Sequence, residues 1–111
     1  MGWIILSKTV ISWNVNGIRA AEEKGLFEWL QAESPDILCL QETKAQQEQL
    51  TEKFIAQKGY TSYFESADKK GYSGVAVYSK ISPVSVTNLN IEKFDNEGRT
   101  LILEYNDFTL I

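Results

Sequence analysis

Residues 9–20 read Thr-Val-Ile-Ser-Trp-Asn-Val-Asn-Gly-Ile-Arg-Ala, a stretch that passes from a strand pattern into a turn within a few residues. Apolar side chains alternate with polar ones as far as Val15, which is typical of a β-strand. The Asn16-Gly17 pair that follows is a strong turn signal. We expect this buried strand to deliver Asn14 and Asn16 to its carboxyl end, where open α/β sheets bind ligands.

A second stretch, residues 37–44, reads Ile-Leu-Cys-Leu-Gln-Glu-Thr-Lys. Its four leading apolar residues predict a strand buried on both faces. The strand leads into Glu42, which is well placed to hold a hard cation such as Mg²⁺, because that ion takes one or two protein carboxylates and keeps several waters. Lys44 would orient Glu42 or contact phosphate. Considered separately, both stretches are better explained by an ordinary turn and by the polar exit of a buried strand.

The remaining sequence alternates helical and strand-like patterns and predicts an α/β fold. We expect one mixed, mostly antiparallel sheet with two helices on one face. A tight turn at Asn106-Asp107 joins the last two strands. The predicted helices cover residues 25–33 and 46–58, and the further strands cover residues 60–65, 74–79, 83–90, 100–105 and 108–111.

A polar loop between two of these strands combines Lys69, Lys70, Gly71 and Tyr72. Basic side chains, a flexible glycine and an exposed aromatic ring suit a loop that contacts a phosphate backbone and packs on sugar or base. The same composition also occurs in solvated loops without a ligand. Farther along, Arg99 would contact phosphate or pair with Asp95 or Glu97, and pairing is the usual fate of a surface charge.

Composition excludes several kinds of site. The chain has 111 residues, no histidine and one cysteine, which excludes histidine-dependent catalysis, a zinc cluster and a disulfide framework within it. The net charge of −4 argues by itself against nucleic-acid binding, since contacts with phosphate groups favour a basic protein surface. The apolar patch at residues 3–6 is too short for a signal peptide or a membrane span, so we expect a cytoplasmic protein without membrane contact.

In their combination and order, four segments resemble the exonuclease III-type apurinic/apyrimidinic (AP) endonucleases of the endonuclease/exonuclease/phosphatase superfamily. The resemblance covers residues 9–111, and its fold would be a four-layer α/β/β/α sandwich built of two similar halves. This chain would be the amino-terminal half. The segments are residues 12–20 (SWNVNGIRA), 35–44 (PDILCLQETK), 71–76 (GYSGVA) and 97–100 (EGRT).

The resemblance implies a role for each matching residue. Glu42 matches the metal-binding glutamate, Asn14 the asparagine beside it, Asn16 a position near the metal, and Lys44 a lysine that supports the carboxylate. Positions against DNA are matched by Arg19, Ala20, Gly71 and Tyr72, with Lys69 and Lys70 on the same loop. The implied activity is Mg²⁺- or Mn²⁺-dependent hydrolysis of double-stranded DNA 5′ of abasic sites, with trimming of 3′ ends.

Family members continue into a tyrosine-containing loop, an Asp-x-Asn pair and an Asp-His pair, none of which follows here. We therefore expect truncation, weak metal binding and little or no activity from the chain alone. The abrupt end of the strand over residues 108–111 supports this expectation. Residues 1–8 would be a foreign or disordered leader. The alternative is a non-catalytic half-domain that forms a homodimer through an open apolar sheet face.

Overall fold

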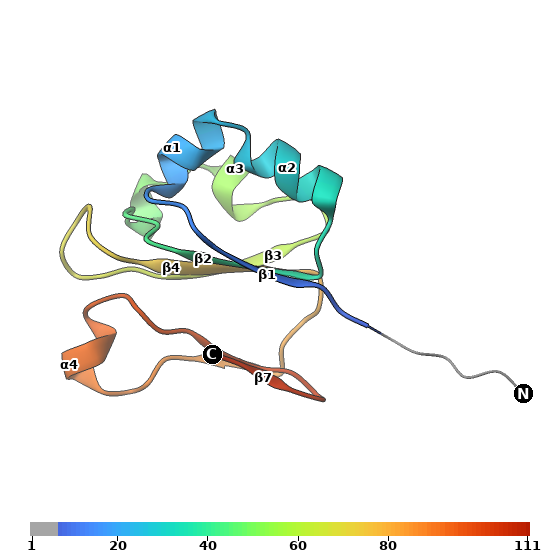
Figure 1. The fold of residues 1–111 in the computed structure, drawn as a ribbon. Coiled ribbons are helices and arrows are strands. Elements are labelled where there is room, and N and C mark those ends of the chain that lie inside the picture. Colours follow the sequence, from blue (N-terminus) through green and yellow to red (C-terminus); the bar gives the residue numbers. More distant parts are fainter. Residues whose placement is uncertain (1–6) are drawn as a thin grey trace, which may run out of the picture.

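The computed structural model describes residues 7–111 of the chain, which form three layers (Figure 1). The predicted leader over residues 1–8 lies outside the described residues except for Ser7 and Lys8. The strands are β1 (Val10–Asn14), β2 (Ile37–Gln41), β3 (Thr61–Glu65), β4 (Val75–Ser79), β5 (Ser85–Thr87), β6 (Ile102–Glu104) and β7 (Thr109–Leu110). The helices are α1 (Ile18–Glu23), α2 (Leu26–Glu33), α3 (Glu52–Ile55) and α4 (Glu92–Asp95), with a 3₁₀ turn η1 (Gln47–Gln49).

The middle layer is a four-stranded mixed sheet in the order β1-β2-β4-β3. Strands β1 and β2 are parallel, with Asn14 opposite Gln41, whereas β4 is antiparallel to both β2 and β3. A parallel pair needs a crossover connection, and α1 with α2 supplies it on one face of the sheet. The parallel arrangement matters for function, because both strands end at the same edge of the sheet.

The helical layer packs on one face of this sheet through a single apolar core (Figure 1). The ring of Phe27 on α2 meets the rings of Phe54 and Tyr78 edge to face, with centroids 5.5 Å and 5.7 Å apart. Such aromatic pairs stabilise a core beyond the area they bury. The fully buried Ile18 and Leu30 complete the contact between helices and sheet.

The helices differ from the sequence prediction. The predicted helix over residues 25–33 is confirmed as α2, but the one over residues 46–58 is wrong. The Gln49 side chain accepts a hydrogen bond from the Gln46 amide and closes a single turn, after which Leu50 and Thr51 are extended. Apolar spacing does not reveal such a break, since the buried side chains before and after it keep a helical interval. Helices α1 and α4 were not predicted.

The third layer is the antiparallel sheet β5-β6-β7, which covers the other face of the four-stranded sheet (Figure 1). Leu103 is fully buried there against Ile37 and Val77, and the Tyr105 hydroxyl donates a hydrogen bond to Ser79 Oγ at 2.9 Å. The predicted turn between the last two strands is confirmed by the pairing of β6 with β7.

The prediction of one sheet is therefore wrong, because the described residues form two. Strand β2 is apolar on both faces, and the sheet can bury its second face only if the chain crosses to form another layer. The sheet β5-β6-β7 therefore covers the face of the four-stranded sheet that the homodimer alternative left open for a second copy. The fourth layer of the family sandwich stays a prediction.

Strand β1 also differs from expectation, since it lies at the edge of its sheet and is not buried. Val10 and Trp13 are 48% and 41% exposed, although Trp13 still meets Trp29 edge to face at 5.3 Å. Alternation of apolar residues predicts a strand but does not reveal how many neighbours it has. None of the helices in the described chain has the length and apolar character needed to cross a bilayer.

The packing of the two sheets predicts a large stability loss on truncating Leu103. Leu103→Ala leaves a cavity between the sheets and should lower the free energy of unfolding by about 3 kcal/mol, measured by urea denaturation. Val84→Ala is the control, because Val84 is 63% exposed and its truncation should cost less than about 0.5 kcal/mol. Equal effects of the two substitutions would contradict the three-layer arrangement.

Candidate active site

The parallel strands β1 and β2 end side by side, which brings the two sequence-predicted segments together. Asn14 is the last residue of β1, and Glu42 directly follows β2. The Asn14 side-chain amide donates a hydrogen bond to Glu42 Oε2. The predicted meeting of these two side chains at neighbouring strand ends is thus confirmed. A donor held against one carboxylate oxygen fixes its orientation and leaves the other oxygen for another partner.

Lys44 and Asn16 extend this contact into a small polar cluster. Lys44 Nζ donates a hydrogen bond to Asn16 Oδ1 at 2.5 Å and lies 3.7 Å from Glu42 Oε1. The backbone N–H of Asn16 in turn donates a hydrogen bond to Asn14 Oδ1 at 3.1 Å. The Glu42 and Lys44 side chains remain 44% and 38% exposed, so the cluster is open to a ligand from solvent.

Main-chain hydrogen bonds join the three loops that carry these side chains. From the first loop, the amides of Gly17 and Ile18 donate to the carbonyls of Glu42 at 2.7 Å and Thr43 at 2.9 Å. From the second loop, the Thr43 amide donates to the Gly74 carbonyl at 3.1 Å. The side chains of the cluster are therefore held by backbone that is itself fixed, a condition for a precise binding site.

This backbone is also strained, since four residues without glycine's freedom adopt the left-handed conformation. They are Asn16 (φ 48°), Glu42 (φ 53°), Lys44 (φ 54°) and Ser73 (φ 52°). Each such residue costs on the order of 1 kcal/mol. The bonds between the loops offset this cost, including one from the Lys44 amide to the Ser73 carbonyl at 2.8 Å. Strain of this kind gathers at functional sites.

The donor set suits a hard cation held mainly by water. Among residues 7–111 there is no group of three or more histidine, cysteine, aspartate or glutamate side chains that could hold a metal. Glu42 is the carboxylate of the cluster, and the side-chain oxygens of Asn14 and Asn16 already accept hydrogen bonds from protein donors. Mg²⁺ accepts such a site, because it needs only one or two carboxylates and retains waters.

A hollow of about 580 Å³ lies next to the cluster. Of the predicted DNA-contacting residues, Arg19, Ala20 and Gly71 line it, together with Thr43, Lys44 and the acid Glu23. The three segments that carry these residues are far apart in sequence, and the fold brings them to one concave surface. Arg19 and Lys44 at its walls supply cations that suit a phosphate group, beside one acid, Glu23.

Tyr72 follows Gly71 in the same loop but lines a different hollow. Lys69 Nζ is 5.6 Å from the centroid of the Tyr72 ring, and Lys70 is exposed on the loop. Lys69 and Tyr72 line a second hollow of about 400 Å³. The predicted contact residues thus divide into a group beside Glu42 and a group around Tyr72.

Arg99 was not predicted to contact Tyr72. Its guanidinium carbon lies 5.3 Å from the Tyr72 ring centroid, and it donates a hydrogen bond to the Tyr72 hydroxyl. Pairing of Arg99 with Glu97 is confirmed, with 3.8 Å between Arg99 Nε and Glu97 Oε2. Asp95, the last residue of α4, instead accepts hydrogen bonds from the backbone amides of Leu89 and Ile91, which precede that helix.

The family model described as "Endonuclease/Exonuclease/phosphatase family" matches residues 11–111, nearly the whole chain. The chain belongs to the endonuclease/exonuclease/phosphatase family. A DNA-(apurinic or apyrimidinic site) endonuclease of Dictyostelium discoideum is 43% identical over 103 residues, which cover 92% of this chain and 28% of that protein. An exodeoxyribonuclease of Bacillus subtilis is 45% identical over 100 residues, covering 88% of this chain and 38% of that protein.

The fold of this family member also matches solved structures. An AP endonuclease from Archaeoglobus fulgidus superposes with a TM-score of 0.75 at 30% identity, covering 93% of this chain and 39% of that one. The chain thus spans between about a quarter and two fifths of the length of these relatives. The α/β fold with a mixed sheet, expected from the resemblance, is confirmed.

The tight packing of Gly74 against Thr43 predicts that a side chain there disturbs the site. A Cβ at Gly74 would lie 2.2 Å from Thr43 Oγ1, and the backbone is left-handed with φ 89°. Gly74→Ala should lower the free energy of unfolding by about 3 kcal/mol in urea denaturation.

Gly71→Ala is the matched control for this substitution. Gly71 is also left-handed, with φ 74°, but a Cβ there meets nothing within 4 Å. Its substitution should cost only about 1 kcal/mol, the conformational cost alone. If Gly74→Ala costs no more than Gly71→Ala, the Gly74 contact does not hold the loop that carries Glu42.

Proposed function

We propose that this chain carries part of the active site of a DNA-repair nuclease that hydrolyses phosphodiester bonds in double-stranded DNA. Incision 5′ of abasic sites and trimming of 3′ ends are the reactions proposed. The observation that carries the proposal is the hydrogen bond between Asn14 and Glu42 at the ends of parallel strands. The hollow beside this pair, which Arg19 and Lys44 line, and the names of the relatives support it.

In this proposal Glu42 holds a Mg²⁺ or Mn²⁺ ion. When bound there, the metal would supply Lewis-acid stabilisation of the charge that develops on a phosphoryl oxygen. Asn14 keeps the Glu42 carboxylate in place through its side-chain N–H. Lys44 limits the negative charge beside Glu42 and also lines the hollow. Asn16, which accepts a hydrogen bond from Lys44, orients that ammonium beside Glu42, the proposed metal ligand.

The DNA backbone would cross from the hollow that Arg19 lines to the loop that carries Tyr72. Arg19 suits a phosphate, because a guanidinium can contact two phosphate oxygens at once. Tyr72 offers a ring face to a sugar or base, and Arg99 with Lys69 adds positive charge beside that ring. Contacts of this kind position DNA without reading its sequence, as a nuclease for abasic sites requires.

The chain by itself should hydrolyse DNA poorly. Metal-assisted hydrolysis needs a metal, an activated water and stabilisation of the developing charge acting together. The cluster at the strand ends supplies one carboxylate, two amides and a lysine, and the sequence has no histidine. We therefore propose that the complete reaction belongs to a longer protein in which further groups face Glu42.

Metal binding at Glu42 gives a direct test of the site. Mn²⁺ broadens the NMR signals of nearby amides, so titration should first broaden those of Asn14–Gly17 and Gln41–Lys44. Glu42→Gln should weaken this binding roughly tenfold or more, since a neutral amide is a poor ligand for a hard cation. Glu48→Gln, on the exposed turn η1, removes the same charge elsewhere and should change nothing. Broadening that persists in Glu42→Gln would refute the assignment.

DNA binding tests the substrate. A fluorescent duplex containing a stable abasic-site analogue should bind the chain weakly at low salt, as measured by anisotropy. Arg19→Ala should reduce the affinity about fivefold and lower the salt dependence by about one phosphate contact. Lys58→Ala, an exposed lysine at the other end of the helical layer, should leave both unchanged.

Incision is measured on the same duplex with Mg²⁺ present. We expect little or no cleavage by the chain alone. Rapid Mg²⁺-dependent cleavage that Glu42→Ala abolishes would contradict the proposed incompleteness of the chain while supporting the site.

For the binding experiment, equal affinities of Arg19→Ala and Lys58→Ala for the duplex would contradict the proposed path of the DNA.

A further inference from the structure

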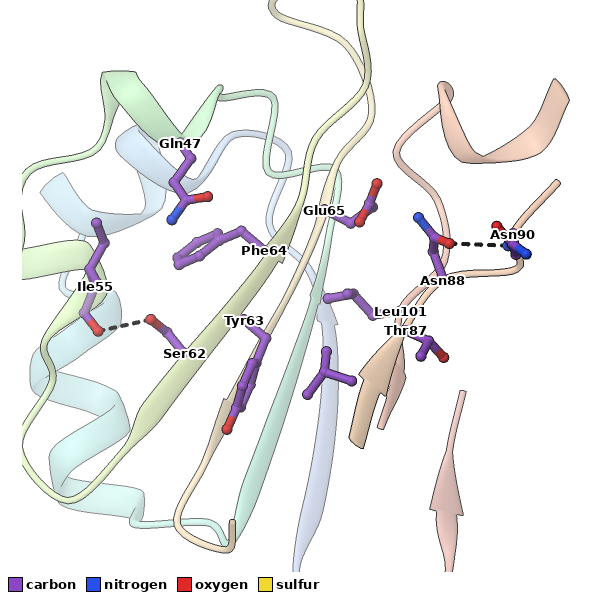
Figure 2. A pocket seen from close by; sticks show the side chains of 11 residues that line it. Gln47, Ile55, Ser62, Tyr63, Phe64, Glu65, Thr87, Asn88, Asn90 and Leu101 are labelled. Carbon is purple, nitrogen blue, oxygen red and sulfur yellow. Dashed lines mark hydrogen bonds between the residues drawn. The ribbon is translucent and has the colours of Figure 1, made fainter. Parts of the chain in front are cut away.

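A groove of about 710 Å³ lies away from the candidate active site, beside strands β3 and β5 (Figure 2). It is larger than either hollow at the site. Helix α3 and the turn η1 contribute Ile55 and Gln47 to one wall, and the segment after β5 contributes Asn88 and Asn90 to the other. None of the residues assigned to metal or DNA lines it.

Both strands that border the groove are edge strands of their sheets. Strand β3 pairs only with β4, and β5 pairs only with β6, in the part of the chain that the structure describes. Four consecutive residues of β3, Ser62 to Glu65, line the groove. Since successive side chains of a strand point to opposite faces, a groove that reaches all four runs along the strand's edge. The unpaired main-chain groups of β3 therefore face into it.

The edge of β3 lacks several of the usual protections against pairing, and its one charged side chain is Glu65 at its end. Its sequence, Thr-Ser-Tyr-Phe-Glu, contains no lysine and no proline, and its register with β4 runs without a bulge. Natural edge strands are commonly blunted by such features, because an open edge is a template for another strand. In many peptide-binding domains, an added strand binds at an unpaired sheet edge that borders a groove for its side chains.

The two sides of β3 differ in character within the groove. Phe64 points toward Ile55 and Gln47, whereas Glu65 points toward Asn88 (Figure 2). Ser62 is held on the first side, where its hydroxyl donates a hydrogen bond to the Ile55 carbonyl at 2.8 Å. A strand added here would place alternate side chains against an apolar wall and against a polar wall with a carboxylate.

The polar wall carries negative charge. Burial raises the pKa of Glu65, its hydrogen bond with Asn88 works in the opposite direction, and the charges of Asp95 and Asp68 raise it further. No lysine or arginine is among the residues that line the groove. An arriving cation would thus meet a partly desolvated carboxylate that has no cationic partner in the groove, with two more acids nearby.

We propose that this groove binds an extended basic peptide segment of a protein partner, which adds a strand to the free edge of β3 and sets a lysine or arginine beside Glu65. Main-chain hydrogen bonds to β3 would supply the register, and Phe64 with Ile55 would take an apolar side chain of the peptide. The proposal does not depend on the nuclease function. It assigns the groove to protein recognition.

Charge decides between a basic peptide and a second copy of the chain. An antiparallel pair of β3 strands would bring together two acidic surfaces, because each copy has a net charge of −4 and carries Glu65, Asp68 and Asp95 around its groove. Like charges facing one another at an interface oppose association. A lysine- or arginine-bearing segment gains the attraction that a second copy lacks.

The test uses a capped peptide in which lysine and valine alternate over about eight residues, a common strand length. Its addition should shift the amide NMR signals of Ser62–Glu65 and Thr87–Asn90 and leave those of Asn14–Gly17 unchanged. Glu65→Gln should weaken binding about fivefold, because it removes one partly buried charge pair. Glu33→Gln, an exposed acid on α2, is the matched control and should bind as the unchanged chain does.

Two comparison peptides separate the contributions. Replacing the lysines with glutamates should abolish binding, and methylating the backbone nitrogens of alternate residues should do the same if the peptide forms a strand. The proposal is overturned if the glutamate peptide binds equally well, or if Glu33→Gln weakens binding as much as Glu65→Gln. A chain that elutes as a dimer and loses this state on Phe64→Lys would show that a second copy occupies the edge.

Discussion

The parallel pairing of β1 with β2 is the constraint on which the candidate site depends. Two parallel strands must finish at one edge of the sheet, and here each finishes in a tight left-handed turn that carries polar side chains. Main-chain bonds from Gly17 and Ile18 join the first turn to the second, and Thr43 joins the second to Gly74. The contact between Asn14 and Glu42 follows from this backbone. The contact does not depend on long, flexible side chains adopting one conformation among many.

The two sheets contribute to function by making that backbone rigid. The four-stranded sheet is packed on both faces, by the helices on one and by β5-β6-β7 on the other. The close-packed interior allows the strands little movement, so the residues at the strand ends are held in fixed positions. At the opposite border of the same sheet, β3 remains unpaired along one side, and its chemistry is unrelated to that of the strand ends. One framework therefore presents a polar cluster and a groove along the edge of β3 on separate borders.

Much of the local structure could be predicted from short patterns. Strand β2 was evident from its apolar run, α2 from its amphipathic spacing, and the turn before β7 from Asn106-Asp107. The long helix predicted over residues 46–58 failed because a side chain bonds to the backbone and ends the turn, which spacing does not reveal. The single predicted sheet failed for a different reason, since the number of layers depends on which faces remain to be covered after the first sheet has formed.

The sequence by itself determined which residues reach the strand ends and what chemistry they carry. An Asn-x-Asn-Gly turn and a carboxylate after an apolar run are local features, fixed by side-chain alternation and turn geometry. Only the tertiary structure decided that β1 is an exposed edge, that Arg99 contacts Tyr72 across 27 residues of sequence, and that β3 and β5 enclose a groove. These relations arise from the order of strands and the stacking of layers, and such long-range choices leave no periodic signal in the chain.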